Sequence, residues 1–195
     1  MKSHTKAWWL AGSAVACLAV IATAAASAAA SARTSLEPVP QLDLDRYAGT
    51  WYEIAKYPNF FQRKCLSDVQ AVYTRRADGL VDVVNSCMER NGAMNAVHGL
   101  ARPDVMPPPM TSKLQVRFAP AWLSWIPFVW GRYWVVMLDP DYRYSVVSEP
   151  RRKYLWILSR EPQLDAATYR KITIRLRELG LDPDKLVKTI QDGDR

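Results

Sequence analysis

The stretch YAGTWYEIAKYP, residues 47–58, places a tryptophan two positions after a glycine, where an alternating run of side chains begins. Such alternation over 50–57 is typical of a β-strand, in which residues two apart share a face. A glycine beside so bulky an aromatic lets the backbone pass close to the indole ring. We therefore expect Trp51 to fill the bottom of a space that this strand helps to enclose.

The chain from Leu42 onward contains seven more runs with strand character, separated by turn residues. They are residues 68–75, 80–88, 95–101, 112–118, 132–138, 143–148 and 154–159. RADG at 76–79 is typical of a hairpin turn. The four prolines within 102–112 exclude a strand or helix interior in that segment.

The hydrophobic period changes to that of a helix in LDAATYRKITIRLRELG, residues 164–180. One helical face would collect four apolar side chains, Tyr169, Ile172, Leu176 and Leu179. Asp165 can cap the start of this helix and Gly180 its end. DPDKLVKTI, which begins at Asp182, predicts a second, shorter helical segment with Pro183 in its first position.

Eight sequential strands of 6–9 residues followed by a helix indicate a single rolled sheet. Closure removes the edges that an open sheet would expose. An eight-stranded barrel is wide enough to hold one small ligand. We predict an all-β fold, an eight-stranded antiparallel up-and-down β-barrel over residues 42–191 with a C-terminal α-helix packed outside it.

The first 32 residues differ from the rest in composition. Lys2 and Lys6 precede an apolar stretch of small residues without acids, which is typical of a secretory signal peptide. We predict cleavage near Ala28 or Ala32, followed by a proline-bearing linker at 33–41. A retained membrane anchor is the alternative, because the stretch is about long enough to cross a bilayer.

Cys17 ends the sequence AVAC, an imperfect match to the lipobox that directs acylation of a cysteine. We expect export to the periplasm or the outer membrane, with a lipid anchor if Cys17 is acylated. In an exported protein the two other cysteines, Cys65 and Cys87, are most simply a disulfide. Two buried thiols are the alternative.

Removal of the first 32 residues would leave 163 of the 195, enough for one domain with a core. The net charge of +7 would fall to +5, since the removed part carries two lysines and no acid. A basic balance favours anionic partners in general. Without a recognisable nucleic-acid-binding module, we expect no nucleic acid partner.

Few residues suggest catalysis. The sequence shows no His, Cys and carboxylate cluster at metal-ligand spacing, no Gly-x-Ser-x-Gly element and no glycine-rich phosphate loop. His98 is the single histidine after the signal-like segment, and we expect it to be a core or rim residue. Glu53 is an acid in an inward position beside Trp51, where hydrogen bonding within the fold is the simpler role. We therefore predict no enzyme activity, no cofactor and no metal.

Three motifs carry a resemblance to a known family. GTWYEIA contains a Gly-x-Trp element at Gly49 and Trp51, and YLWILSR ends in Arg160. Between them, LDPDYRYSVV looks like a second element, the turn between the sixth and seventh strands, with Asp139, Asp141 and Tyr142. In this order the motifs resemble those of the lipocalins, specifically the bacterial outer-membrane lipoprotein (Blc-like) group related to apolipoprotein D. The resemblance covers residues 42–191.

In an up-and-down barrel, the start of the first strand and the end of the eighth lie at one end. Trp51 and Arg160 can therefore meet in a cation–π contact, with Gly49 allowing close approach. Counting alternate residues from these positions predicts an inner surface that could bind a ligand. Its expected members are Ala55, Tyr57, Leu114, Val116, Phe118, Val135, Met137, Trp156 and Leu158. The parity of the sixth strand is open, because both of its faces are apolar.

The loops at the opposite end carry aromatic and basic residues, which we expect to surround the mouth of the barrel. They include Phe60, Phe61, Trp122, Trp125, Phe128, Trp130, Arg151 and Arg152. Tryptophan suits a membrane–water boundary, and arginine and lysine suit anionic headgroups. Contact with a membrane surface is one interpretation, and folding of the aromatics inward as a lid is the other.

The resemblance implies binding, storage or transport of lipids, such as fatty acids or lysophospholipids, for bacterial membrane maintenance. It also implies that a homodimer could form. The alternatives are an enzyme acting on a sequestered hydrophobic substrate and a carrier of a pigment or haem-like ligand.

Overall fold

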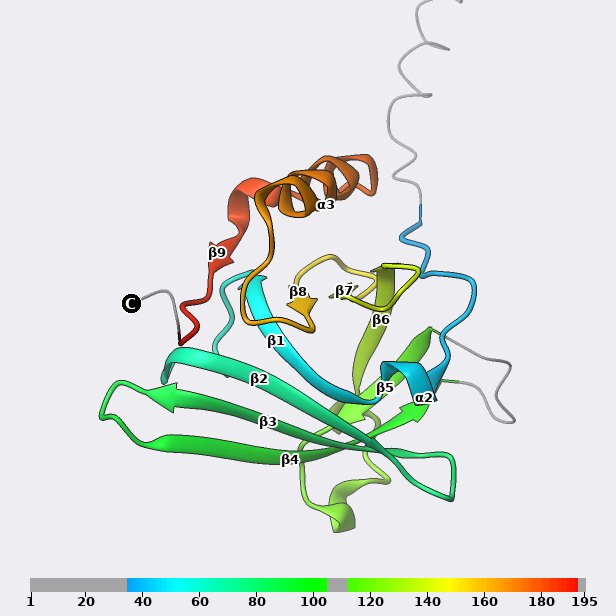
Figure 1. The fold of residues 1–195 in the computed structure, drawn as a ribbon. Coiled ribbons are helices and arrows are strands. Elements are labelled where there is room, and N and C mark those ends of the chain that lie inside the picture. Colours follow the sequence, from blue (N-terminus) through cyan, green and yellow to red (C-terminus); the bar gives the residue numbers. More distant parts are fainter. Residues whose placement is uncertain (1–34, 105–111, 193–195) are drawn as a thin grey trace, which may run out of the picture. The chain divides into compact units, whose positions relative to one another are not determined.

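The computed structural model describes residues 35–104 and 112–192 (Figure 1). The helical elements are α2 (Leu44–Tyr47), η1 (Ala121–Leu123), η2 (Pro127–Val129), α3 (Ala166–Glu178) and η3 (Pro183–Lys185). The strands are β1 (Gly49–Lys56), β2 (Cys65–Arg75), β3 (Val81–Glu89), β4 (Met94–Pro103), β5 (Lys113–Arg117), β6 (Gly131–Leu138), β7 (Tyr144–Ser148), β8 (Leu155–Ser159) and β9 (Val187–Lys188).

The strands form one antiparallel sheet that closes on itself. Neighbours in sequence pair from β2 through to β8, and β1 pairs with both β8 and β2. Helix α3 lies against the outside of this barrel, over β7 and β8 (Figure 1). The predicted eight-stranded up-and-down barrel with an external C-terminal helix is therefore confirmed.

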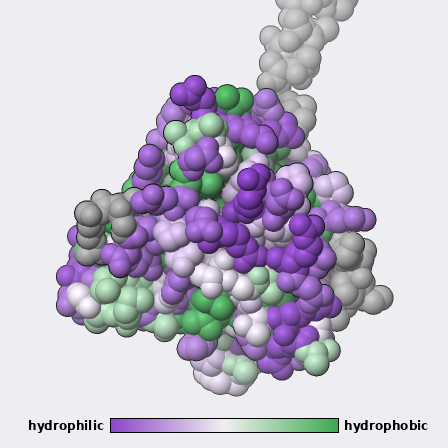
Figure 2. All heavy atoms as spheres, in the orientation of Figure 1, coloured by the Kyte–Doolittle hydropathy of each residue, from purple (hydrophilic) through white to green (hydrophobic). Residues whose placement is uncertain are grey.

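Helix α3 forms where the sequence places its caps and apolar face. The Asp165 side chain accepts a hydrogen bond from the Thr168 backbone at 2.9 Å, and Gly180 has a φ of +70° just after the helix. Ile172 and Leu176 are fully buried against the barrel. Figure 2 shows one face of the molecule, which carries mostly hydrophilic side chains, with hydrophobic ones in small separate groups.

Two short elements differ from expectation. The segment after Asp182 makes only the 3-10 turn η3 and then becomes extended as β9, because Lys188 pairs with Ala55 of β1. Helix α2 was not predicted from the sequence. Its N-cap is Asp43, whose Oδ1 accepts from the backbone of Asp45 at 2.9 Å and Arg46 at 3.2 Å.

The buried apolar residues form two clusters, separated by the barrel wall. The inner cluster comprises Leu42, Tyr47, Trp51, Ala71, Tyr73, Val81, Val83, Ala101, Leu114, Val135, Val147 and Leu158, with Val116, Tyr133 and Trp156 packed against it. The outer cluster contains Ile54, Ala55, Tyr57, Val136, Met137, Val146, Ile157, Ile172 and Leu176, and so fills the space between wall and helix. Successive residues of β7 and β8 alternate between the two clusters, as a pleated strand requires.

Two β-bulges invert this alternation, and three predictions of inward position fail because of them. Along β1 the pairing with β8 passes from Glu53 directly to Ala55, and along β6 the pairing with β7 passes from Val135 to Met137. One extra residue turns every following side chain to the other face. Ala55, Tyr57 and Met137 consequently lie in the outer cluster against α3, not inside the barrel.

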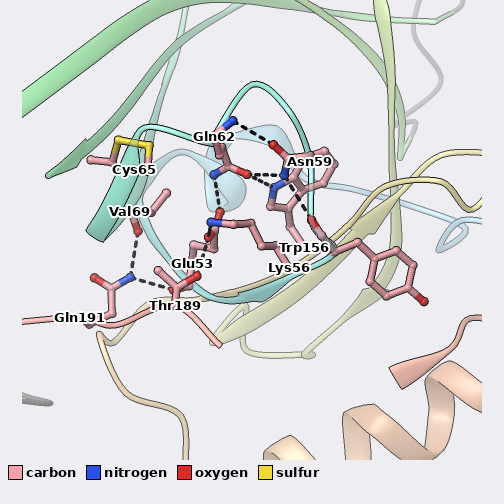
Figure 3. A network of polar contacts seen from close by, with 11 residues as sticks. Glu53, Lys56, Asn59, Gln62, Cys65, Val69, Trp156, Thr189 and Gln191 are labelled. Carbon is pink, nitrogen blue, oxygen red and sulfur yellow. Dashed lines mark hydrogen bonds and ion pairs between the residues drawn. A yellow bond between two sulfur atoms is a disulfide. The ribbon is translucent and has the colours of Figure 1, made fainter. Parts of the chain in front are cut away.

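The C-terminal segment completes the wall where β1 and β2 separate. Their ladder ends at the pair Tyr52 and Gln70. Beyond it, the Gln191 side-chain amide donates to the backbone oxygens of Glu53 at 2.7 Å and Val69 at 2.9 Å (Figure 3). The backbone of residues 189–190 also bonds to both strands, through Thr189 N to Ile54 O and Asp68 N to Ile190 O.

Candidate ligand-binding site

One end of the barrel is sealed by the contact expected between Trp51 and Arg160. The Arg160 guanidinium carbon lies 3.9 Å from the centre of the indole, and Trp51 is fully buried. The guanidinium also donates to the carbonyls of Thr50 at 2.8 Å and Arg46 at 2.7 Å. Gly49 has a φ of +94°, and a Cβ there would lie 3.3 Å from Arg160 Nη1. Only glycine fits this position without strain.

The second motif shapes the β6–β7 turn at the same end. Asp139 is buried, and its Oδ2 accepts from the Arg143 Nε at 3.0 Å and from the backbone N–H of Asp141 at 3.1 Å. Burial acts to raise the pKa of Asp139, but these hydrogen bonds and the Arg143 charge outweigh it and lower that pKa. Tyr142 accepts from the Asp43 backbone at 3.0 Å and so ties this turn to the start of α2.

The segment predicted as a linker also covers the closed end. Leu36 is buried in the outer cluster, and Val39 packs against the inner one. The Val39 backbone N–H donates to Val135 O at 2.8 Å. Leu42 is 1% exposed and extends the inner cluster towards α2. The described part of this segment is therefore built into the barrel.

A chain of hydroxyl groups crosses the interior next to Trp51. Tyr47 Oη lies 2.8 Å from Tyr133 Oη and 2.9 Å from Ser145 Oγ, and Tyr73 Oη lies 3.1 Å from Tyr133 Oη. Burial raises the pKa of Tyr47 to about 12 and also raises the pKa values of Tyr73 and Tyr133. The four hydroxyls are joined by only three links, so one O–H in the chain has no acceptor within it.

The remaining interior surface is apolar and opens towards the other end. Leu114, Val116, Val135, Trp156 and Leu158, all expected to face inward, belong to the inner cluster or pack against it. Phe118 follows β5 and lies over Gly99 of β4, where an added Cβ would come within 2.7 Å of its ring. Phe118 is 42% exposed, whereas Leu114 is 4% exposed. The interior is thus packed near the closed end and accessible to solvent farther up.

The β1–β2 loop packs across one side of this open end. The Phe61 ring lies 6.1 Å from Trp156 in a stacked arrangement and 5.4 Å from Tyr154. The indole N–H of Trp156 donates to Gln62 Oε1 at 3.2 Å (Figure 3). Phe60 remains 65% exposed. Of the two expected mouth residues in this loop, Phe61 therefore lies beside an inward tryptophan, and Phe60 stays in solvent.

The β5–β6 loop, residues 118–130, holds three aromatic side chains in solvent. Trp122, Trp125 and Phe128 are 73%, 78% and 96% exposed. Trp130 lies differently. The centre of its ring lies 3.9 Å from the guanidinium carbon of Arg102. Arg102 pairs with Gln115 and points to the outer face, so Trp130 packs on the outside of the barrel.

The β7–β8 loop contributes one exposed arginine to the mouth and turns the other away. Arg151 is exposed, while Arg152 has a φ of +56° and donates from Nε to Leu179 O at 3.2 Å. A cation at the C-terminal end of a helix is favourable. Arg152 therefore caps α3, and its expected role at the mouth does not match its position.

The predicted disulfide is confirmed. Cys65 at the start of β2 is bonded to Cys87 near the end of β3. The bond anchors the strand end that follows the β1–β2 loop, so the residues of that loop are held next to the wall.

The two residues that sequence reasoning kept as catalytic alternatives lie apart. Both carboxylate oxygens of Glu53 are occupied, since they accept from Lys56 Nζ at 2.6 Å, Thr189 Oγ1 at 2.5 Å and Gln62 Nε2 at 2.7 Å (Figure 3). His98 is exposed and pairs with Val84 of β3. Both side chains lie on the outer face of the sheet, because the next pair, Gly99 and Val83, lies on the inner face.

Residues 35–104 and 112–192 contain no group of three or more His, Cys, Asp or Glu side chains placed to hold a metal ion. Within the same ranges, no helix combines the length and the hydrophobicity needed to cross a bilayer. Cys17 and the predicted signal peptide lie outside the described residues.

Sequence reasoning missed the hydroxyl chain and α2. Tyr73 and Tyr133 stand at inward positions of two predicted strands, and that was the available signal for the hydroxyls. For α2 the signal was Asp43, which accepts the bonds of an N-cap.

A closed barrel with a sealed polar floor and an accessible apolar upper half defines a class of protein that holds a small hydrophobic molecule.

Comparison with known proteins identifies the family. Residues 42–191 match the family model described as "Lipocalin-like domain", and the chain belongs to the lipocalins. It is 41% identical to temperature-induced lipocalin-1 of Arabidopsis thaliana over 160 residues, 82% of this chain and 84% of that protein. It is 38% identical to the outer membrane lipoprotein Blc of Citrobacter freundii over 157 residues, 80% of this chain and 82% of that one.

Solved structures agree on the fold. Insecticyanin from the tobacco hornworm Manduca sexta superimposes with a TM-score of 0.63 at 21% identity, covering 80% of this chain and 84% of that one. Lipocalins bind small hydrophobic ligands, and the resemblance stated from the three motifs is confirmed.

Proposed function

We propose that this protein binds a single-chain lipid, a fatty acid or a lysophospholipid, inside its barrel and stores or transports it in the service of bacterial membrane maintenance. The observation that carries the proposal is the accessible apolar surface within the barrel. Phe118 and Val97 stand on the inner face and are 42% and 47% exposed, while the residues below them are buried. A hydrophobic tail would cover this surface, and each buried CH₂ contributes about 0.8 kcal/mol.

The charges at the mouth favour an anionic head on the ligand. Arg63, Lys64, Arg151 and Lys153 stand in the β1–β2 and β7–β8 loops, which lie at the open end. Such exposed charges select a head weakly because solvent screens them. The tail therefore supplies most of the affinity, and the head sets a preference.

The exposed aromatics of the β5–β6 loop would bring the mouth to a membrane. Trp122, Trp125 and Phe128 are more exposed than apolar residues on a soluble surface usually are. At a bilayer surface their rings would enter the headgroup region. This contact supports loading of a lipid from the bilayer into the barrel, and the relative from Citrobacter freundii is named as an outer membrane lipoprotein.

A pair of neighbouring substitutions tests the cargo site. Val97→Trp would place an indole in the accessible part of the interior, whereas His98→Trp would place it on the outer face of the same strand. In a fluorescence titration with a long-chain fatty acid, we expect the first variant to lose binding and the second to bind like the wild type. Equal binding by all three proteins would contradict a cargo site inside the barrel.

The head preference has its own test, a titration with a fatty acid and the corresponding alcohol at low salt. Tighter binding of the acid supports a role for the mouth charges. Mass spectrometry of an organic extract of the purified protein then shows whether fatty acids or lysophospholipids are its cargo.

A further inference from the structure

A second cleft lies on the outside of the barrel, where the β5–β6 loop folds back against the wall. Its volume is about 460 Å³. Arg102, Gln115 and Arg132 line it from the barrel, and Ser124, Trp125 and Trp130 line it from the loop. Of these residues, only Trp125 has a part in the proposed function, as one of the exposed aromatics of the loop.

Strand register places the barrel side of the cleft in one row. Gln115 of β5 pairs with Arg102 of β4 on one side and with Arg132 of β6 on the other. Residues paired across antiparallel strands point to the same face. Since neighbouring strands are about 4.8 Å apart, the two arginine backbones flank Gln115 at a separation of about 10 Å.

The cleft carries positive charge without an acidic partner. Among the described residues, Arg102, Arg132 and the adjacent Arg117 form no ion pair. Arg117 is only 7% exposed, and its buried Nε has no hydrogen-bond partner within that part of the chain. The nearest acid in the hydrogen-bond network, Asp104, bonds to the Gln115 amide. Like charges gathered on one sheet face are unfavourable unless an anion joins them.

The guanidinium groups of Arg102 and Arg117 are held in place. Arg102 donates from Nε and Nη2 to Gln115 Oε1 at 3.1 and 2.8 Å, and the Trp130 ring lies 3.9 Å from its guanidinium carbon. Arg117 lies 5.3 Å from the same ring. The Trp130 indole N–H donates to Ser124 O at 2.8 Å, which fixes the ring within the loop. Gln115 takes up the Nε and Nη2 donors of Arg102 and so orients the guanidinium, and a phosphate oxygen would meet its Nη1 group.

We propose that this outer cleft binds the phosphate monoester headgroup of a membrane lipid. A phosphate monoester carries a charge of about −1.5 to −2 near neutral pH. This charge matches the two guanidinium groups of Arg102 and Arg132, which form no ion pair with an acid in the described part of the chain. The choice of a lipid over a soluble phosphate rests on the loop itself. Trp125 lines the cleft and is 78% exposed, and Phe128 beside it is 96% exposed. Rings that enter the headgroup region would bring the cleft to the depth of the lipid phosphates.

The test uses vesicles of phosphatidylcholine that contain either phosphatidic acid or phosphatidylglycerol, adjusted to equal zeta potential. At equal surface charge we expect the full-length protein to bind the phosphatidic acid vesicles about tenfold more tightly, since the extra charge-assisted hydrogen bonds form only with the monoester. Arg102→Gln with Arg132→Gln should abolish this preference. The control, Arg170→Gln with Lys171→Gln, removes the same charge from the exposed side of α3 and should keep it.

Three results would overturn the proposal: equal wild-type binding to both kinds of vesicle, a preference that survives in the double cleft variant, or binding of glycerol 3-phosphate in solution as tight as binding to vesicles. Urea midpoints show whether each variant is folded. The cargo titration is measured in parallel, because the cleft lies outside the barrel and its substitutions should leave fatty acid binding unchanged. Failure of cargo binding in the wild type would thus count against the proposed function and not against the cleft.

Discussion

At the scale of single residues, the closed end depends on a glycine that approaches a charged side chain. Gly49 and Gly79 share a positive φ, +94° and +82°, but only Gly49 has an atom, Arg160 Nη1, within 4 Å of an added Cβ. Substituting alanine at each position therefore distinguishes the cost of backbone strain from the cost of losing the contact between Arg160 and Trp51.

Gly49→Ala should lower the free energy of unfolding by about 2–4 kcal/mol, because strain at the backbone adds to displacement of Arg160 from Trp51. Gly79→Ala should cost only the backbone part, about 1–2 kcal/mol. Urea denaturation of both variants measures the difference. Equal losses would show that the contact with Arg160 adds nothing.

The hydroxyl chain makes stability depend on alkaline pH. The pKa of Tyr47 is raised to about 12 in the folded protein, and those of Tyr73 and Tyr133 are also raised, whereas unfolded tyrosines ionise near their usual value of about 10. Above that value the unfolded chain binds fewer protons than the folded one. The contribution of these tyrosines to the free energy of unfolding is therefore fully present below pH 10 and falls as the pH rises towards 12.

Tyr73→Phe should reduce this alkaline loss, because one group that titrates late is removed. The slope of unfolding free energy against pH between 10 and 12 is the measurement. The same comparison between pH 7 and pH 9, below the usual pKa of tyrosine, is the control and should give equal slopes for both proteins. A wild-type slope in the Tyr73 variant would contradict the expected contribution of the buried chain.

At the scale of elements, the sequence predicts strands well and their faces less well. Alternation and turn residues identify the β-strands, and the periodic face of 164–180 identifies α3. The bulges at Ile54 and Val136 have no such pattern. Both faces of β6 are apolar near Val136, so burial does not choose a register there, and on β1 the charged Glu53 and Lys56 pair with the inward Leu158 and Trp156 of β8, against the usual preference. Ala55 and Met137 were therefore assigned to the wrong face.

Side chains in loops were harder still. Trp130 and Arg152 were placed at the mouth by topology alone, and each instead finds a partner outside the barrel, Arg102 in one case and the end of α3 in the other. Such contacts depend on tertiary structure, which a local pattern does not encode. The seal between Trp51 and Arg160 was predictable because both residues occupy strand ends, whose place in an up-and-down barrel is determined by chain order.

The C-terminal segment gives a prediction for an element that fills a gap. Gln191→Leu should cost about 1–3 kcal/mol of unfolding free energy, because the carbonyls of Glu53 and Val69 lose their donor. Gln191→Glu has the same size but presents oxygen in place of nitrogen, so it should cost more near neutral pH. Lowering the pH should restore part of that loss as the carboxyl gains a proton. A Glu variant as stable as the wild type at pH 7 would contradict the role of this donor.

At the scale of the whole molecule, the disulfide should matter for stability more than for shape. Cys65 and Cys87 are 22 residues apart and join strands that are already paired. A cross-link over such a loop stabilises by about 3 kcal/mol, mainly through the unfolded chain. Cys65→Ser with Cys87→Ser should lower the urea midpoint accordingly, while far-UV circular dichroism and fatty acid binding stay close to wild type. A loss of the barrel spectrum in the variant would show that the bond is needed for the fold.

The wall between β1 and β2 has a consequence for how the protein is made. The gap between these two strands is filled by residues 187–191, and Gln191, which bonds to Val69, is made 122 residues after it. The barrel cannot close fully before this segment has emerged from the ribosome, so the nascent chain stays in an open form until then.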